Sequence, residues 1–120
     1  DDEQIKNGTG IDHNFILSSD RDLTGLRPAA EVFDPRSGRA MRVYTDMPSV
    51  QLYTGNFLSR RDGEKGVSYG KRRALCLETQ CAPDSIHHPG EAGYDIAAVD
   101  SEHTFRSATV YAFSVKNERV

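Results

Sequence analysis

Residues 30–45 read AEVFDPRSGRAMRVYT, and this stretch decides the fold class. Residues 30–33 are typical of a strand. They stop at residues 34–38, where Pro35 and Gly38 occupy positions that turns favour. Residues 41–45 follow at once, with β-branched and aromatic side chains. The stretch therefore predicts an antiparallel β-hairpin.

The rest of the chain repeats this short-strand pattern. Further strands are expected around residues 15–17, 50–54, 74–80 and 105–115, and no convincing amphipathic helix is present. A polar, glycine-containing loop covers residues 63–70. Strands at this spacing predict an all-β sandwich or barrel. The irregular stretch at residues 81–101 is long for a compact domain, so it either frames a site or packs against something absent from this chain.

Length and charge narrow the function classes. The 120 residues suffice for one domain or a piece of a larger one. The net charge of −3, with acids and bases interspersed, argues against nucleic-acid binding. The basic runs at residues 60–61 and 71–73 are typical of solvated loops. No apolar run is long enough to span a membrane, and the acidic start is unlike a signal peptide. A cytoplasmic protein without membrane partners is expected.

The two cysteines, Cys76 and Cys81, are five residues apart, with no histidine between them. On a single strand they would point to opposite faces, because side chains alternate. Free thiols in a reducing compartment are therefore favoured over a disulfide or a zinc site. We expect no metal and no organic cofactor.

Glu78 is the best candidate for a catalytic base. Leu75 and Leu77 alternate with Cys76 and Glu78, a pattern open to a strand that lines a cavity. Burial raises the pKa of a carboxyl group toward the range useful for proton transfer. The alternative is a strand carboxylate that is paired with a nearby Arg or Lys.

Two further residues are candidates for binding a polar ligand. Asp12 is either a turn or cap residue or an acceptor of hydrogen bonds from a polyol. Gln51 lies between Val50 and Leu52, so it is either solvent-exposed or presents its amide to a sugar hydroxyl. The histidines are read as surface groups; they are His13, His87, His88 and His103.

Several segments together resemble one family, aldose 1-epimerase, also called galactose mutarotase. They occur in the family's order and span nearly the whole chain. The matching segments are residues 10–15 (GIDHNF), 51–58 (QLYTGNFL), 76–80 (CLETQ), 83–85 with 88–89 (PDS and HP), and 109–115 (TVYAFSV).

The resemblance implies a galactose-mutarotase-like β-sandwich, of which residues 1–120 are the C-terminal part. It implies interconversion of the α and β anomers of aldohexoses such as glucose or galactose. In this reading Glu78 is the catalytic base, and Asp12 and Gln51 bind the substrate. No cofactor is implied, because both proton transfers are within reach of ordinary side chains.

This chain also departs from the family in one respect. The family's catalytic acid is a histidine from an earlier portion, and no histidine here falls on that position. Three hypotheses follow. The chain is part of an epimerase that is active only when the remainder is supplied, for example by another chain. Alternatively, it binds carbohydrate without turnover, or it is a structural subunit that reuses the fold.

Overall fold

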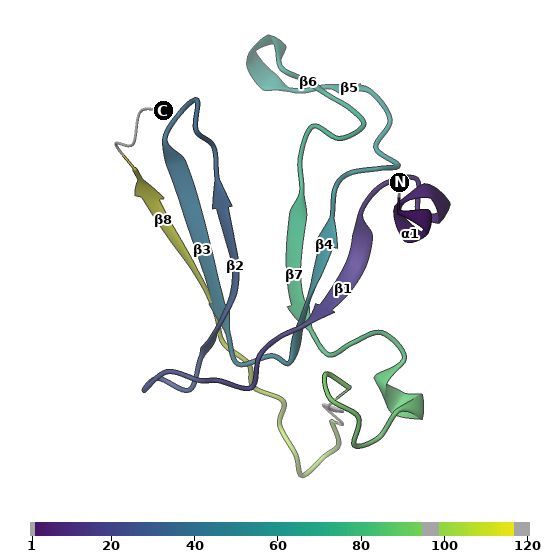
Figure 1. Ribbon diagram of the computed structural model, residues 1–120, viewed down its shortest axis with the longest axis vertical. Coiled ribbons are helices and arrows are strands. Elements are labelled where there is room, and N and C mark those ends of the chain that lie inside the picture. The colour runs from purple at the N-terminus through teal and green to yellow at the C-terminus, as the bar shows by residue number, and fades with distance from the viewer. Residues whose placement is uncertain (1, 95–98, 117–120) are drawn as a thin grey trace.

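The computed structural model describes residues 2–94 and 99–116. The described elements follow one another as α1 (Glu3–Asn7), β1 (Asp12–Ile16), β2 (Arg27–Phe33), β3 (Arg39–Thr45), β4 (Ser49–Tyr53), β5 (Arg61–Asp62), the 3-10 turn η1 (Glu64–Gly66), β6 (Ser68–Tyr69), β7 (Cys76–Gln80), the 3-10 turn η2 (Ser85–His87) and β8 (Thr109–Val115). Every described strand pairing is antiparallel. The predicted all-β class is therefore confirmed (Figure 1).

Two three-stranded sheets form the body. The first, sheet A, has the order β1-β4-β7, and the second, sheet B, has the order β2-β3-β8 (Figure 1). The predicted hairpin is β2 and β3, joined by residues 34–38. Gly38 has φ +73°, and a Cβ there would lie 2.6 Å from the Lys116 carbonyl oxygen. Only glycine fits this turn without displacing the end of β8.

The sheets touch at one end through threonine hydroxyls. Thr45, which is fully buried, places its Oγ1 3.0 Å from Thr109 Oγ1. Thr109 Oγ1 in turn lies 2.7 Å from Thr79 Oγ1 on sheet A. These contacts show which faces of the two sheets are turned toward each other: the one with Thr79 on β7 and the one with Thr109 on β8.

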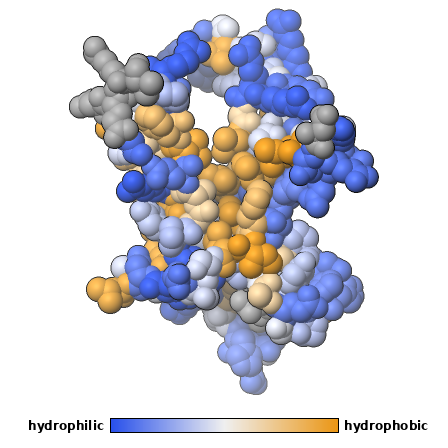
Figure 2. Space-filling model, in the orientation of Figure 1, coloured by the Kyte–Doolittle hydropathy of each residue, from blue (hydrophilic) through white to orange (hydrophobic). Residues whose placement is uncertain are grey.

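At the opposite end the sheets diverge (Figure 1). The inward-facing Phe113 and Val115 are 77% and 70% exposed there. Figure 2 shows apolar side chains gathered along the gap between the sheets. The buried apolar core is correspondingly small, and consists of Ala40, Val43, Val50 and Ala82 among the described residues.

Three local features were not predicted. Helix α1 forms because Asp2 Oδ1 accepts hydrogen bonds from the backbone N–H groups of Gln4 and Ile5. A helix of one turn is too short to show the hydrophobic periodicity of a helix. Strands β5 and β6 make a two-residue ladder, in which β6 lies inside the predicted loop of residues 63–70 and β5 lies just before it. The 3-10 turn η2 lies in the predicted irregular stretch, whose residues 95–98 are outside the described part. No helix in that part is long and apolar enough to cross a membrane.

Candidate active site

Three strands bring the predicted site residues onto one face of sheet A. Asn14 on β1 is directly opposite Gln51 on β4, and Gln51 is directly opposite Glu78 on β7. One row further on, Asp12 is opposite Tyr53. Because side chains alternate across a strand, Glu78 points to the face opposite Thr79. The site face of sheet A, defined here as the face with Asp12, Asn14, Gln51 and Glu78, is therefore turned away from sheet B.

A hydrogen bond joins two of the predicted residues. Gln51 Nε2 donates to Asp12 Oδ1 over 2.8 Å. The Gln51 Oε1 atom is buried and has no hydrogen-bond partner in the described part of the chain. Asp12 is exposed and Gln51 half-buried. The alternative reading of Asp12 as a turn residue does not apply, because it is the first residue of β1.

The expectation that Glu78 is buried is wrong. Its side chain is exposed on the site face, so the described residues do not remove it from water. The alternative, an ion pair with Arg or Lys, is not seen either among residues 2–94 and 99–116. The exposed carboxylate of Glu78, beside Gln51, can therefore accept hydrogen bonds from a ligand.

The segment before β1 is fixed by a buried amide. Asn56 is 2% exposed, and its Nδ2 donates to the Ile11 carbonyl oxygen over 2.8 Å. Thr54 Oγ1 donates to the same carbonyl oxygen over 3.1 Å. These bonds hold the backbone immediately before Asp12. Asn56 belongs to the matched segment 51–58, and the structure gives it an anchoring role.

The histidines lie away from this row. His13 is on the opposite face of β1, where it accepts a hydrogen bond at Nδ1 from the Asp12 backbone N–H. The other three each lie near a carboxylate three residues away in the chain, a pairing that the sequence reading had not assigned to them. These pairs are His87 with Asp84, His88 with Glu91 and His103 with Asp100. Within the described residues no cluster of His, Cys, Asp or Glu could hold a metal ion. Both cysteines are free, Cys76 exposed on the site face and Cys81 half-buried.

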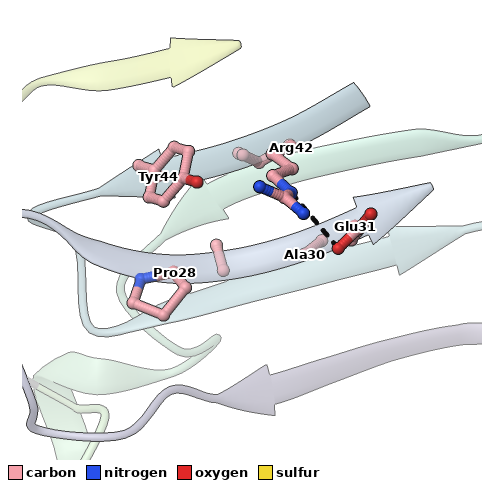
Figure 3. A pocket seen from close by; sticks show the side chains of 7 residues that line it. Pro28, Ala30, Glu31, Arg42 and Tyr44 are labelled. Atoms are coloured by element: carbon pink, nitrogen blue, oxygen red, sulfur yellow. Dashed lines mark ion pairs between the residues drawn. The ribbon is translucent and has the colours of Figure 1, made fainter. Parts of the chain in front are cut away.

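A separate pocket of about 400 Å³ lies over β2 and β3 (Figure 3). Its charged groups are already paired. Glu31 Oε2 lies 3.3 Å from Arg42 Nε, and Glu31 Oε1 accepts from Lys116 Nζ. None of the predicted site residues lines it. The chemistry favours sheet A, where acceptors remain open.

Asn14 shares the site face but was not predicted as a site residue. The alternation of Asp12 and Asn14 on one strand was the signal that could have found it. Together the four side chains offer carboxylate and amide groups that can donate to and accept from a ligand rich in hydroxyls. The fold and this face define an all-β protein with a hydrogen-bonding sheet surface suited to a polyol.

Comparison with known proteins places the chain in one family. It matches the aldose 1-epimerase family over residues 1–111. It is 39% identical to galactose mutarotase of Mus musculus over 107 residues, which are 88% of this chain and 30% of the relative. It is 44% identical to galactose mutarotase of Bos taurus over 81 residues, 67% of this chain and 23% of the relative. It is 37% identical to aldose 1-epimerase of Escherichia coli over 89 residues, 74% of this chain and 25% of the relative.

The chain belongs to the aldose 1-epimerase family. It spans less than a third of the length of each of these three relatives. The predicted family and the all-β architecture are thus confirmed, whereas the roles of Asp12, Gln51 and Glu78 stay predictions.

Proposed function

We propose that the site face of sheet A is the sugar-binding and base-carrying part of an aldose 1-epimerase site. The observation that supports this most directly is the register of β1, β4 and β7, which puts Asp12, Gln51 and Glu78 on one face. The substrate class is the aldohexoses, with glucose and galactose as the first candidates. Asp12 and Gln51 bind sugar hydroxyls, and Glu78 is the general base.

The proposed reaction needs two proton transfers. Glu78 takes the proton from the anomeric hydroxyl, whose oxygen becomes the carbonyl oxygen of the open chain. The bond between C1 and the ring oxygen breaks, and an acid gives its proton to that oxygen. Rotation about the C1–C2 bond and the reverse transfers then close the ring on the other face. General acid–base catalysis of this kind contributes about 10²–10⁴-fold at each group.

The acid is assigned to a histidine that this chain does not supply. His13 is on the wrong face of β1, and the other histidines belong to segments outside sheet A. We assign the missing groups to a further polypeptide segment, either in the same protein or in another chain. The edges of sheet A support this. Within residues 2–94 and 99–116, no further strand pairs with the edge strands β1 and β7 of sheet A, and unpaired edges favour pairing with further strands.

Such a segment would also supply what Glu78 lacks here. A base in contact with bulk water is less effective than one in a closed site, because solvent weakens every electrostatic interaction nearby. A segment laid over the site face would exclude that water.

Polarimetry on fresh α-D-glucose and α-D-galactose tests the proposal, using the longest form of the protein that its parent transcript encodes. We expect Glu78→Gln to lower the mutarotation rate by ~10²–10⁴-fold. Glu64→Gln is the matched control, since Glu64 is an exposed glutamate in η1, outside sheet A. An unchanged rate in Glu78→Gln would show that the base is misassigned.

The exposure of Glu78 favours a second candidate, a carbohydrate-binding unit without turnover. The two functions separate by titration with the same sugars. A binder shifts its backbone amide resonances on sugar addition yet leaves the optical rotation at its uncatalysed rate of change.

A further inference from the structure

Asn14 lies in the same row as the proposed base. It is directly opposite Gln51, which is directly opposite Glu78. Residues that face each other in this way have Cβ atoms about 4.5–5.5 Å apart. The Asn14 side chain is therefore within reach of any sugar that contacts Gln51 and Glu78 together.

A buried serine fixes the orientation of the Asn14 amide. Ser49 is fully buried, and its Oγ donates to the Gln80 carbonyl oxygen over 2.7 Å. A hydroxyl has a single hydrogen, so Ser49 Oγ can only accept from Asn14. Asn14 Nδ2 lies 3.1 Å from Ser49 Oγ, as this requires. The amide oxygen Oδ1 takes no part in this bond and can accept a hydrogen bond from a ligand.

That oxygen has no hydrogen-bond partner among residues 2–94 and 99–116. Unlike Gln51 Oε1, it is not a buried atom. An acceptor that is held in place, open and unpaired is what a sugar hydroxyl needs.

We propose that Asn14 is a further sugar-contacting residue, whose Oδ1 accepts a hydrogen bond from a hydroxyl of the aldohexose, and that Ser49 is a positioning residue that holds the amide. The inference rests on the proposed function of the same face. Asn14 acts in binding, and the proton transfers remain with Glu78 and the external acid.

The test measures the Kd of galactose and glucose, and the KM and kcat of mutarotation, on the longest form that the parent transcript encodes. We expect Asn14→Ala to raise Kd and KM ~3–10-fold with kcat little changed, the effect of losing one hydrogen bond made equally in ground and transition states. Asn7→Ala is the control, since Asn7 is an exposed asparagine in α1. Asn14→Val, which suits a strand and has no hydrogen-bonding group, replaces Asn14→Ala if that variant does not fold.

A double-mutant cycle tests the role of Ser49. If Ser49 acts through Asn14, Ser49→Ala raises Kd in the wild-type background and has no further effect in Asn14→Ala. An equal effect of Ser49→Ala in both backgrounds would overturn the positioning role.

Monodeoxy galactoses identify the contact. The wild type should lose affinity for one analogue, lacking the 2-, 3-, 4- or 6-hydroxyl, and Asn14→Ala should show no further loss for that analogue.

A wild-type Kd in Asn14→Ala would overturn the inference. Glu78→Gln keeps the outcomes apart: loss of turnover in Glu78→Gln together with a wild-type Kd in Asn14→Ala defeats the inference alone. If Glu78→Gln keeps its turnover and Asn14→Ala raises Kd, the assignment of the base is wrong and the role of Asn14 in binding still holds. No sugar binding by the wild type would overturn both.

Discussion

Gln51 and Asp12 are 39 residues apart in the chain and are joined by a 2.8 Å hydrogen bond from Nε2 to Oδ1. Because an ionised carboxylate only accepts, the nitrogen of the amide must face Asp12. The oxygen Oε1 then takes the other side, where it is buried without a partner in the described chain. A buried unpaired acceptor costs about 1–3 kcal/mol of folding free energy. Sheet A therefore carries a destabilising atom at the position assigned to substrate binding.

Replacing Gln51 by leucine should separate stability from binding. Gln51→Leu removes the unpaired oxygen while keeping a side chain of similar size, so we expect the free energy of unfolding to stay the same or rise by about 1 kcal/mol. The affinity for galactose should fall, because the amide is lost. Urea denaturation and sugar titration measure the two effects, with Gln4→Leu as the exposed-glutamine control. A less stable variant with unaltered sugar affinity would contradict the assignment.

Gly10→Ala should disturb the start of β1. Gly10 has φ +142°, and a Cβ there would lie 2.0 Å from Asn56 Oδ1. Asn56 must then move, and it anchors the Ile11 carbonyl oxygen beside Asp12. We expect a loss of about 1–3 kcal/mol in unfolding free energy, with weaker sugar binding.

The matched control for that change is Gly70→Ala, since a Cβ on Gly70 meets nothing within 4 Å. Thermal unfolding followed by circular dichroism compares the two variants. Equal melting temperatures would show that the contact between Gly10 and Asn56 does not hold β1.

The diverging sheets should bind an apolar dye. Phe113 is 77% exposed on the inward face of β8, next to the exposed Val115. Contiguous apolar surface of this kind binds anilinonaphthalene sulfonate, whereas a single exposed apolar residue does not. Phe113→Ser should lower the dye fluorescence of the purified chain. Leu23→Ser removes a fully exposed leucine from the connection between β1 and β2, and should leave the fluorescence unchanged.

The acid stability of sheet B should depend on Glu31. The hydrogen bond from Lys116 holds the pKa of Glu31 below its ordinary value of 4.5, with a further contribution from Arg42. A carboxyl group whose pKa is lower in the folded state stabilises the fold above its unfolded pKa. That stabilisation is lost as the pH falls from about 4.5 through the lower folded value.

Glu31→Gln should therefore lower the melting temperature at pH 7 and have less effect at pH 3, because pH 3 lies below the ordinary pKa of 4.5 and part of the stabilisation is already lost there. Melting temperatures of both proteins at pH 7, 5 and 3 check this, at low salt because exposed pairs are screened. A difference that is as large at pH 3 as at pH 7 would exclude the ion pairs as its cause.

Most strands could be predicted from local patterns. The hairpin of β2 and β3 is visible because its turn residues and its alternating side chains are all within one short stretch. Strands β4, β7 and β8 follow the same logic, with boundaries within four residues of those predicted. Helix α1 was not predicted because its formation depends on a single capping side chain, that of Asp2.

The site could be predicted only in part. Asp12, Gln51 and Glu78 were candidates from the local sequence, and the family resemblance assigned their roles, but their shared face depends on the register of three strands that are far apart in sequence. The exposure of Glu78 could not be read from alternation, which separates two faces of a strand without saying which one is covered. Asn14 could have been named from its alternation with Asp12, but its contact with Ser49, 35 residues away, could not.

The ladders of sheet A run through every residue of β1, β4 and β7 without a bulge. Deleting or inserting one residue inside any of these strands would reverse its side chains beyond that point, so that polar residues of the site face would turn to the apolar side. We therefore expect length changes to be tolerated only in connections such as residues 59–73 and 81–108. A reading-frame-preserving indel scan should show tolerance there and abrupt loss of folding within the three strands.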